Sequence, residues 1–221
     1  MSVPTATDRG PNVQEMTVIH RVFRRELVMI PRLVRAIDGR NTDRVRLVGE
    51  HIEFLLAFLH AHHSGEDELL WPRLLDRAAP SAGLVHTMQE QHARVEQYTG
   101  AAGDALRQWV GAPATATGDR LAGLVDELRA ALVTHLDLEE QEILPLISRY
   151  ITVEEWALLA EHGKNAMPRK QLPLVFGAML EDADPAERAE LLAAVPAPIR
   201  FFLRTAGARQ YRRYITRLRT G

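Results

Sequence analysis

The chain has 221 residues, of which 46% are hydrophobic, so it is long enough to bury one substantial core. It contains no cysteine, which excludes disulfides, thiolate metal ligands and nucleophilic thiols. The formal net charge is −2: residues 1–149 hold 16 Arg and no Lys against 21 acids, whereas residues 150–221 hold 11 basic residues against 8 acids. Because the larger part is acidic, we expect no nucleic-acid partner.

The sequence also bears on location. Its first residues lack the basic patch and apolar run of a secretory leader, and no apolar stretch approaches the ~18 residues of a membrane span. We therefore expect a soluble, cytoplasmic protein with no membrane partner, in which residues 1–12 form a flexible N-terminal tail. The sequence leaves the oligomeric state open.

Apolar residues recur at helical spacing along almost the whole chain, and no segment alternates as a half-buried strand would. The first predicted helix covers residues 13–38, with Pro31 as a kink and Gly39 as its C-terminal stop. Asn41 or Thr42 can cap a second helix that extends to about residue 77.

A third helix is predicted from residue 80 to about residue 110, and a fourth follows the linker GAPATATG and runs from residue 119 to about residue 148. Four helices joined by short loops predict an all-α fold, namely an antiparallel up-down-up-down four-helix bundle over residues 13–149. Residues 150–221 should form a helical C-terminal extension packed on this bundle. It begins with a capping box of Thr152 and Glu155, and Gly163 ends its first helix.

The second and fourth predicted helices repeat one pattern, HHSGEDELLWP at residues 62–72 and HLDLEEQEILP at residues 135–145. In each, a histidine is followed four residues later by a glutamate and ten residues later by a proline. Residues four apart lie on one face of a helix, separated by about 40° and about 6 Å, so their side chains can converge. The pairs are His62 with Glu66 and His135 with Glu139. If both helices face inward, the two carboxylates can bridge two cations.

A buried pair of carboxylates without a counter-charge is strongly disfavoured, because each ion loses solvation and the two repel each other. A metal offsets both effects. The first and third helices each offer one suitable histidine, and the predicted ligand set is His20, His62, Glu66, His92, His135 and Glu139. Four imidazoles and two carboxylates suit iron better than magnesium or calcium, which prefer all-oxygen ligands.

The remaining histidines and acids near these motifs are interpreted as ordinary core or surface residues: His51, His60, His86, His162, Asp67, Glu68, Glu140 and Glu142. His63 stays open, because it adjoins a ligand but points about 100° away from it. Gly65 also allows two interpretations. It is either a tolerated packing glycine or a glycine whose missing side chain leaves room beside the metals for a small ligand.

Taken in order, the segments HRVFRREL, HHSGEDELLWP, QEQH and HLDLEEQEILP resemble those of the hemerythrin-like HHE cation-binding proteins, over residues 13 to about 149. The resemblance implies a non-haem di-iron centre in a four-helix bundle, with two irons per chain bridged by oxygen species and carboxylates. Oxygen-carrying members have a second histidine four residues before the one on the third helix, where this chain has Met88. A thioether is a poor ligand for hard iron, so we expect an open coordination position on one metal.

The resemblance further implies a protein connected with oxidative stress that binds or reacts with dioxygen, peroxide or nitric oxide. Three hypotheses are open: catalase-like or peroxidase-like turnover, oxygen or nitric oxide sensing or storage without turnover, and a regulatory role for the basic C-terminal helix. That helix, IRFFLRTAGARQYRRYITRLRTG, carries seven arginines and no acid. Such a helix either contacts nucleic acid or an acidic surface, or lays its aromatic side chains on the body and leaves its arginines solvated or paired with the acidic bundle.

Overall fold

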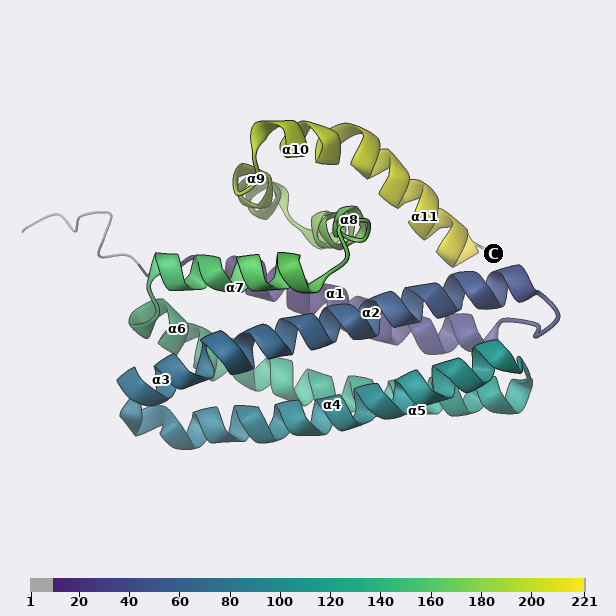
Figure 1. Ribbon diagram of the computed structural model, residues 1–221, viewed down its shortest axis with the longest axis horizontal. Helices are drawn as coiled ribbons and strands as arrows, with labels where there is room; N and C mark the ends of the chain where they lie inside the picture. Colours follow the sequence, from purple (N-terminus) through teal and green to yellow (C-terminus); the bar gives the residue numbers. More distant parts are fainter. Residues whose placement is uncertain (1–9, 221) are drawn as a thin grey trace, which may run out of the picture.

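A computed structural model describes residues 10–220, and every regular element in this range is helical (Figure 1). The predicted all-α fold class is therefore confirmed. The predicted tail, residues 1–12, lies outside the described residues except for its last three. The helices are α1 (Gln14–Arg35), α2 (Thr42–Leu69), α3 (Trp71–Arg77), η2 (Ala79–Ser81), α4 (Ala82–Gly111), α5 (Thr115–Leu138), η3 (Glu139–Ile143), α6 (Leu144–Tyr150), α7 (Val153–Ala166), α8 (Leu172–Asp182), α9 (Pro185–Ala193), α10 (Ala197–Phe202), η4 (Leu203–Gly207) and α11 (Ala208–Thr220).

The four long helices α1, α2, α4 and α5 lie side by side along the longest axis of the molecule (Figure 1). α5 packs most extensively against α4 and α1, and α2 contacts both α1 and α4. Their inner stripes supply fully buried side chains such as Val22, Phe23, Ile52 and Val125. Isolated helices are marginal in water, so this shared apolar core stabilises all four together.

Two predicted helices are interrupted, and a proline follows each interruption. The second predicted helix ends at Leu69 and resumes as α3, whereas the fourth passes through the π-helical turn η3 before α6. Pro72 and Pro145 each stand second in the new helix, where a missing N–H costs no hydrogen bond. The fourth helix also starts earlier than predicted, because α5 begins at Thr115 inside the expected linker.

Two predicted helix stops are wrong. α1 ends at Arg35, so Gly39 does not cap it, and no glycine within residues 10–220 has a positive φ. α7 continues through Gly163 to Ala166. A glycine in a helix interior costs only about 1 kcal/mol relative to alanine, which neighbouring packing readily offsets.

Side chains complete several helix ends. The carboxamide of Asn41 accepts the backbone N–H of Arg44 at 3.1 Å, and Thr152 with Glu155 forms the predicted capping box. The Arg44 guanidinium in turn donates to the carbonyl oxygen of Arg217 at 2.6 Å, near the end of α11. The last carbonyls of a helix lack partners within it, so this contact satisfies them and ties α11 to α2.

The C-terminal helices, defined here as α7 to α11, cover the face formed by α1 and α2 (Figure 1). α7 packs on α2, α8 and α9 pack on α1, and α11 packs on α8. Within the part of the chain that the structure describes, no helix has the length and apolar character needed to cross a bilayer.

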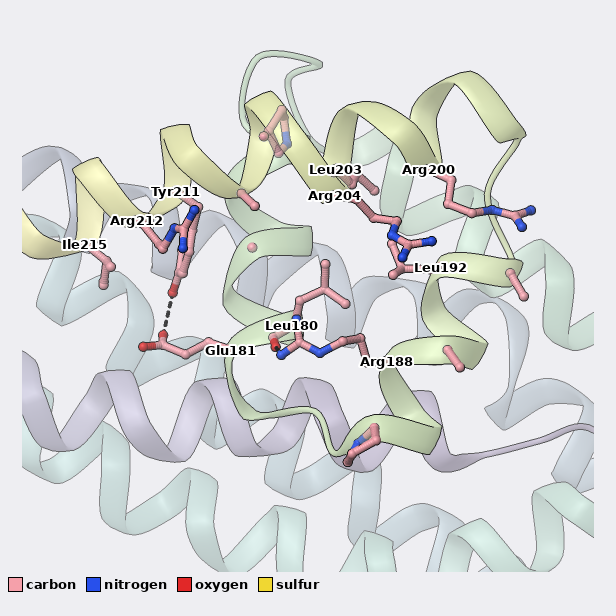
Figure 2. Close-up of a pocket in the computed structure, with 17 residues that line it drawn as sticks. Leu180, Glu181, Arg188, Leu192, Arg200, Leu203, Arg204, Tyr211, Arg212 and Ile215 are labelled. Atoms are coloured by element: carbon pink, nitrogen blue, oxygen red, sulfur yellow. Dashed lines mark hydrogen bonds between the residues drawn. The ribbon is translucent and has the colours of Figure 1, made fainter.

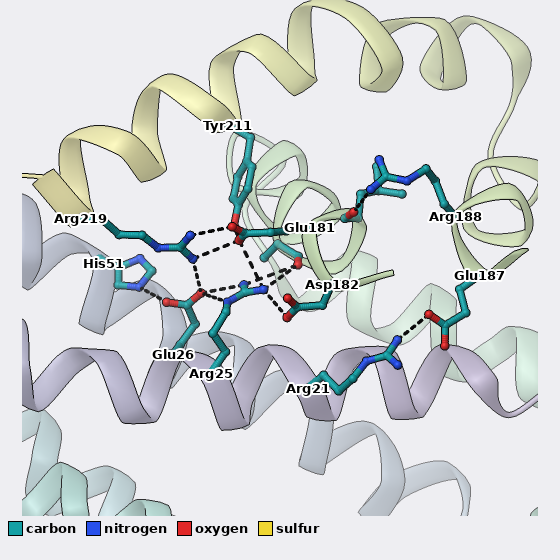
Figure 3. Close-up of polar contacts among 12 residues, drawn as sticks. Arg21, Arg25, Glu26, His51, Glu181, Asp182, Glu187, Arg188, Tyr211 and Arg219 are labelled. Atoms are coloured by element: carbon teal, nitrogen blue, oxygen red, sulfur yellow. Dashed lines mark hydrogen bonds and ion pairs between the residues drawn. The ribbon is translucent and has the colours of Figure 1, made fainter. Parts of the chain in front are cut away.

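A buried polar network joins α1 to the C-terminal helices (Figure 3). Glu26 is buried, and its Oε1 accepts a hydrogen bond from Nε of Arg25 at 2.8 Å, while its Oε2 lies 3.1 Å from Nε2 of His51. Burial alone would raise the pKa of Glu26, but His51 and Arg25 outweigh it and lower that pKa. His51 also bonds the hydroxyl of Tyr214 at 2.8 Å, so both of its ring nitrogens are satisfied, as expected for a core histidine.

Gly177 allows α11 to approach α8 closely. A Cβ at this position would overlap the ring of Tyr211, well inside van der Waals contact. The ring is held at its other end, because its hydroxyl donates to Glu181 at 2.7 Å. It therefore cannot swing aside without losing that hydrogen bond.

We expect Gly177→Ala to lower the free energy of unfolding by about 1–3 kcal/mol, as overpacking does in cores. The sign is informative, because glycine to alanine inside a helix ordinarily stabilises by about 0.5–1 kcal/mol. Gly100→Ala in α4 is the matched control, since a Cβ there meets nothing within 4 Å. Urea denaturation of both variants measures the difference, and equal stabilisation of the two would show that α8 and α11 are only loosely packed.

Candidate metal centre

Seven histidine and glutamate side chains converge in the core between the four long helices. Each is at most 8% exposed, and together they include all six predicted ligands. Their potential ligand atoms form two groups, and within each group all atoms lie within 4.8 Å of one another. The three-imidazole group is His63, Glu66, His92 and His135, and the two-imidazole group is His20, His62 and Glu139.

The carboxylates of Glu66 and Glu139 lie between the imidazoles of the two groups. Oε1 of Glu66 is 3.2 Å from Nε2 of His62, and its Oε2 is 3.3 Å from Nε2 of His92. Oε2 of Glu139 is 3.4 Å from Nε2 of His20 and 3.5 Å from the imidazole of His135. Each carboxylate therefore faces one imidazole of each group, which is the arrangement required to bridge two cations.

Among residues 10–220, most of these candidate ligand atoms find no hydrogen-bond partner although they are fully buried. A buried polar atom without a partner costs free energy, and a buried charge costs more. Hydrogen bonds to these atoms would need donor groups placed between the carboxylates and the imidazoles. A cation in the same place would satisfy the carboxylate oxygens and the imidazole nitrogens at once. The atoms without a partner are Nε2 of His20, His62 and His63, and both carboxylate oxygens of Glu66 and Glu139.

His63 belongs to the site, although its direction on the helix left it open in the sequence. Its ring stacks on that of His92 with centroids 4.1 Å apart, and it meets the ring of His135 edge to face at 5.0 Å. The signal that could have found it is its spacing from Glu66. Residues three apart on a helix share a face just as residues four apart do, so His62 and His63 flank the same carboxylate.

Two acids that were predicted to be solvated instead support the imidazoles from outside. Oδ1 of Asp67 lies 2.7 Å from Nδ1 of His92, and Oε1 of Glu140 lies 2.9 Å from Nδ1 of His20. The carboxylates of Asp67 and Glu140 are part-exposed. Their position on the solvated face therefore did not prevent them from reaching the core. Asp67 also accepts a hydrogen bond from Nε1 of Trp71 at 2.8 Å.

These contacts direct the Nε2 atoms of both histidines inward, as partners of metal-bound imidazoles commonly do. Burial would lower the pKa of His92, but its contacts with Asp67 and Glu66 outweigh this and raise the pKa to about 9. A third imidazole is oriented in the same way, because Nδ1 of His135 lies 3.2 Å from Oε1 of Gln91.

Burial also shifts the pKa values of the remaining groups. Burial and the charge of Glu139 raise the pKa of Glu66 to about 8. Burial would raise the pKa of Glu139 as well, but His20 and other imidazoles lower it instead. Burial drives the pKa values of His62 and His63 well below the usual range, so these imidazoles are neutral near pH 7 and keep a lone pair for a metal.

The π-helical turn η3 begins at Glu139, so the carboxylate stands where the helix changes its pitch. Pro145 cannot donate to the carbonyl of the residue four positions before it, and the wider turn accommodates the missing bond. Single π-helical turns are rare and are frequently found at functional sites. The proline of the repeated motif thus accompanies a local change in the helix just after the glutamate.

Gly65 is a packing glycine, and the alternative that it leaves room beside the metals is wrong. A Cβ there would meet Cδ1 of Leu159 at 2.8 Å and Cδ2 of His162 at 3.1 Å, both on α7. Its missing side chain therefore lets α7 approach α2. His162 is part of this contact between α7 and α2, since its Nε2 lies 3.1 Å from the hydroxyl of Ser64.

A small cavity, called here the apolar chamber, lies between α1, α2, α7 and α8 and has His62 in its wall. Its volume is about 100 Å³, and most of its lining is apolar, including Phe58, Trp156 and Met179. Glu15 and Lys164 also contribute to the lining. The chamber borders the two-imidazole group, because His62 is the one lining residue that belongs to either group.

The helical fold and the buried nitrogen and oxygen donors define a cation-binding protein. The model of the hemerythrin HHE cation-binding domain family matches residues 12–147, which is more than half of the chain. The chain belongs to this family, and the resemblance of its four segments is confirmed. Searches among curated proteins and among solved structures found no match.

We expect Asp67→Asn to weaken cation binding by about 10–100-fold, the usual effect of losing an outer carboxylate partner of a ligating histidine. Glu68→Gln is the matched control, because it removes the same charge from the neighbouring, exposed position. Competition with a chromophoric chelator measures both affinities. Equal affinities for the two variants would mean that the contact between Asp67 and His92 does not orient a ligand.

Proposed function

We propose that the protein holds two irons in this centre and binds or reacts with a small oxidant: dioxygen, nitric oxide or peroxide. The observation that carries the proposal is the set of seven buried, unpartnered ligand atoms in two groups joined by two carboxylates. Mixed imidazole and carboxylate donors suit iron. When bound, iron would supply redox chemistry and coordination positions for the oxidant. The proposed ligands are His20, His62, His63, Glu66, His92, His135 and Glu139.

The two groups are unequal, and this difference supports a proposal for the exchangeable position. His63 brings the group around His92 to three imidazoles, although Met88 replaces the histidine of oxygen carriers. The two-imidazole group has fewer protein donors and borders the apolar chamber through His62. We therefore assign the open position to the metal held by the two-imidazole group, and no longer to the one near Met88.

The size and lining of the apolar chamber favour small, uncharged ligands. A volume of about 100 Å³ admits a diatomic molecule and excludes most metabolites. Its mainly apolar wall desolvates dioxygen or nitric oxide at little cost, whereas peroxide would lose hydrogen bonds. Binding or sensing of a diatomic ligand is thus better supported than peroxide turnover. Gas evolution on adding peroxide to the iron-loaded protein would instead favour peroxide turnover.

We also propose that residues 13–149 form the antiparallel four-helix bundle and that residues 150–221 are an extension packed on it. The proposal is supported by the course of the chain in Figure 1, where successive long helices run in opposite directions. The interruptions at η3 and before α3 leave the direction of each helix unchanged. The apolar chamber gives the extension a role, because α7 and α8 supply part of its wall.

Expression with added iron should yield about two irons per chain, and removal of the iron should lower the melting temperature, because a cation that binds only the folded chain stabilises it. Glu66→Ala with Glu139→Ala should abolish iron binding. The control, Glu68→Ala with Glu142→Ala, removes the same charge from exposed positions of the same motifs and should keep the iron. Metal analysis and calorimetry test this, and a wild-type preparation without any transition metal would refute it.

Filling the apolar chamber should slow ligand binding without loss of iron. Gly163 lines the chamber, and a Cβ there meets nothing within 4 Å, so Gly163→Leu can place its side chain in free space. We expect about tenfold slower nitric oxide binding, equivalent to a barrier about 1.4 kcal/mol higher. Gly123→Leu on α5 is the control, because its Cβ is equally free and it lies outside the chamber. Stopped-flow rates that are the same for both variants would exclude this route.

A further inference from the structure

A second cavity, called here the basic groove, lies among the C-terminal helices (Figure 2). It has a volume of about 790 Å³, within the range of ligand pockets, and it shares no lining residue with the metal centre or the apolar chamber. Its floor is apolar and comes from α8, α9, η4 and α11. Its apolar lining residues include Leu180, Leu192, Leu203 and Ile215.

Four arginines stand around this apolar floor: Arg188, Arg200, Arg204 and Arg212 (Figure 2). Within residues 10–220 none of them forms an ion pair with a carboxylate. Arg188 donates only to the carbonyl oxygen of Leu180, and Arg200 only to that of Val195 at 3.3 Å. Nε of Arg200 is buried without a hydrogen-bond partner, so an acceptor is missing at this point.

The single acid that lines the basic groove does not neutralise these arginines. Glu181 already accepts from Arg219 at 2.6 Å and from the hydroxyl of Tyr211, and it lies 3.3 Å from Arg25 (Figure 3). On α1, beneath the C-terminal helices, Arg21 is paired as well, with Glu187 of α9 at 2.6 Å. The groove thus carries four arginines, and no acid in its lining is left to offset their charge.

We propose that the basic groove binds a single-chain anionic amphiphile, a carboxylate with an alkyl tail of the fatty-acid type. The carboxylate lies among the guanidinium groups, whose planar forks match it with two parallel hydrogen bonds, and the tail covers the leucine floor. An inorganic anion would use only the arginines and leave the floor uncovered. A membrane surface or a nucleic acid would contact the exposed arginines but is too broad to cover apolar side chains that lie between α8, α9, η4 and α11.

The test uses the full chain as purified, with decanoate as the probe and calorimetry as the readout. Decanoate should bind, whereas 1-decanol, which has the tail without the charge, and acetate, which has the charge without the tail, should each bind at least about tenfold more weakly. Ala189→Trp, which narrows the groove from α9, should also weaken decanoate binding. Melting curves establish that each variant is folded.

The decisive comparison is between two charge-matched double variants of the same helical segment. Arg204→Gln with Arg212→Gln removes two groove arginines and should weaken decanoate binding by about tenfold or more. Arg209→Gln with Arg213→Gln removes two exposed arginines outside the groove and should leave it unchanged.

Three results would overturn the proposal. Equal affinities of the two double variants would show that only net charge matters. Inorganic phosphate competing as well as decanoate would mark a simple anion site. Binding to anionic phospholipid vesicles without binding of monomeric decanoate would identify a membrane-facing surface. None of these outcomes depends on the iron content, so this proposal and that of the metal centre can fail separately.

Discussion

The burial of two carboxylates and five imidazoles in one water-poor core is the constraint on which the rest of the structure depends. Each carboxylate would lose several kcal/mol of solvation as an isolated ion, and the two repel each other across the centre. The protein reduces this cost in part, because the pKa of Glu66 is raised and Glu139 is surrounded by imidazoles. Within residues 10–220, seven of the candidate ligand atoms are still left without hydrogen bonds. A pair of cations would remove this deficit, and packing alone does not.

Helix interruptions accompany this burial. Glu66 and Glu139 are each followed six residues later by a proline, and each helix breaks between the two, at Leu70 or in η3. A proline inside an unbroken helix would remove a hydrogen bond and clash with the preceding turn, at about 3 kcal/mol. Placed at the start of a new helix it costs little. The repeated motif thus encodes two things, a pair of candidate ligands on one helical face and the end of that face.

The helical class and the four long helices follow from periodicity, and the two histidine–glutamate pairs follow from spacing, because both depend on residues within one turn of each other. His20 and His92 were predicted only because the remaining two helices each offer a histidine. His63 was left open, although its spacing of three residues from Glu66 places both on one helical face. Asp67 and Glu140 were misjudged for a different reason. Their roles depend on which neighbouring helix lies beside them, and that is a tertiary property. Asp67 is on the solvated side of α2 and still reaches His92 on α4.

Two glycines also have roles that depend on tertiary contacts. Gly65 serves the contact with α7, and Gly177 serves the contact with Tyr211, and neither partner is close in sequence. The π-helical turn and the continuation of α7 through Gly163 show the same limit. A local pattern identifies a residue that is unusual for a helix, but only the packing partner decides whether the helix ends, bends or continues there.

α8 gives the C-terminal helices two separate roles, because it is apolar on two stripes. Leu172, Val175, Phe176 and Met179, spaced by three and four residues, line the apolar chamber. Pro173, Gly177, Leu180 and Glu181 have the same spacing and line the basic groove. The two cavities are therefore separated by about one helix diameter, roughly 10 Å. A helix that is apolar on both sides must be covered on both. One side of α8 closes the space beside His62. The other side faces the basic groove, and α11 covers it from across that groove.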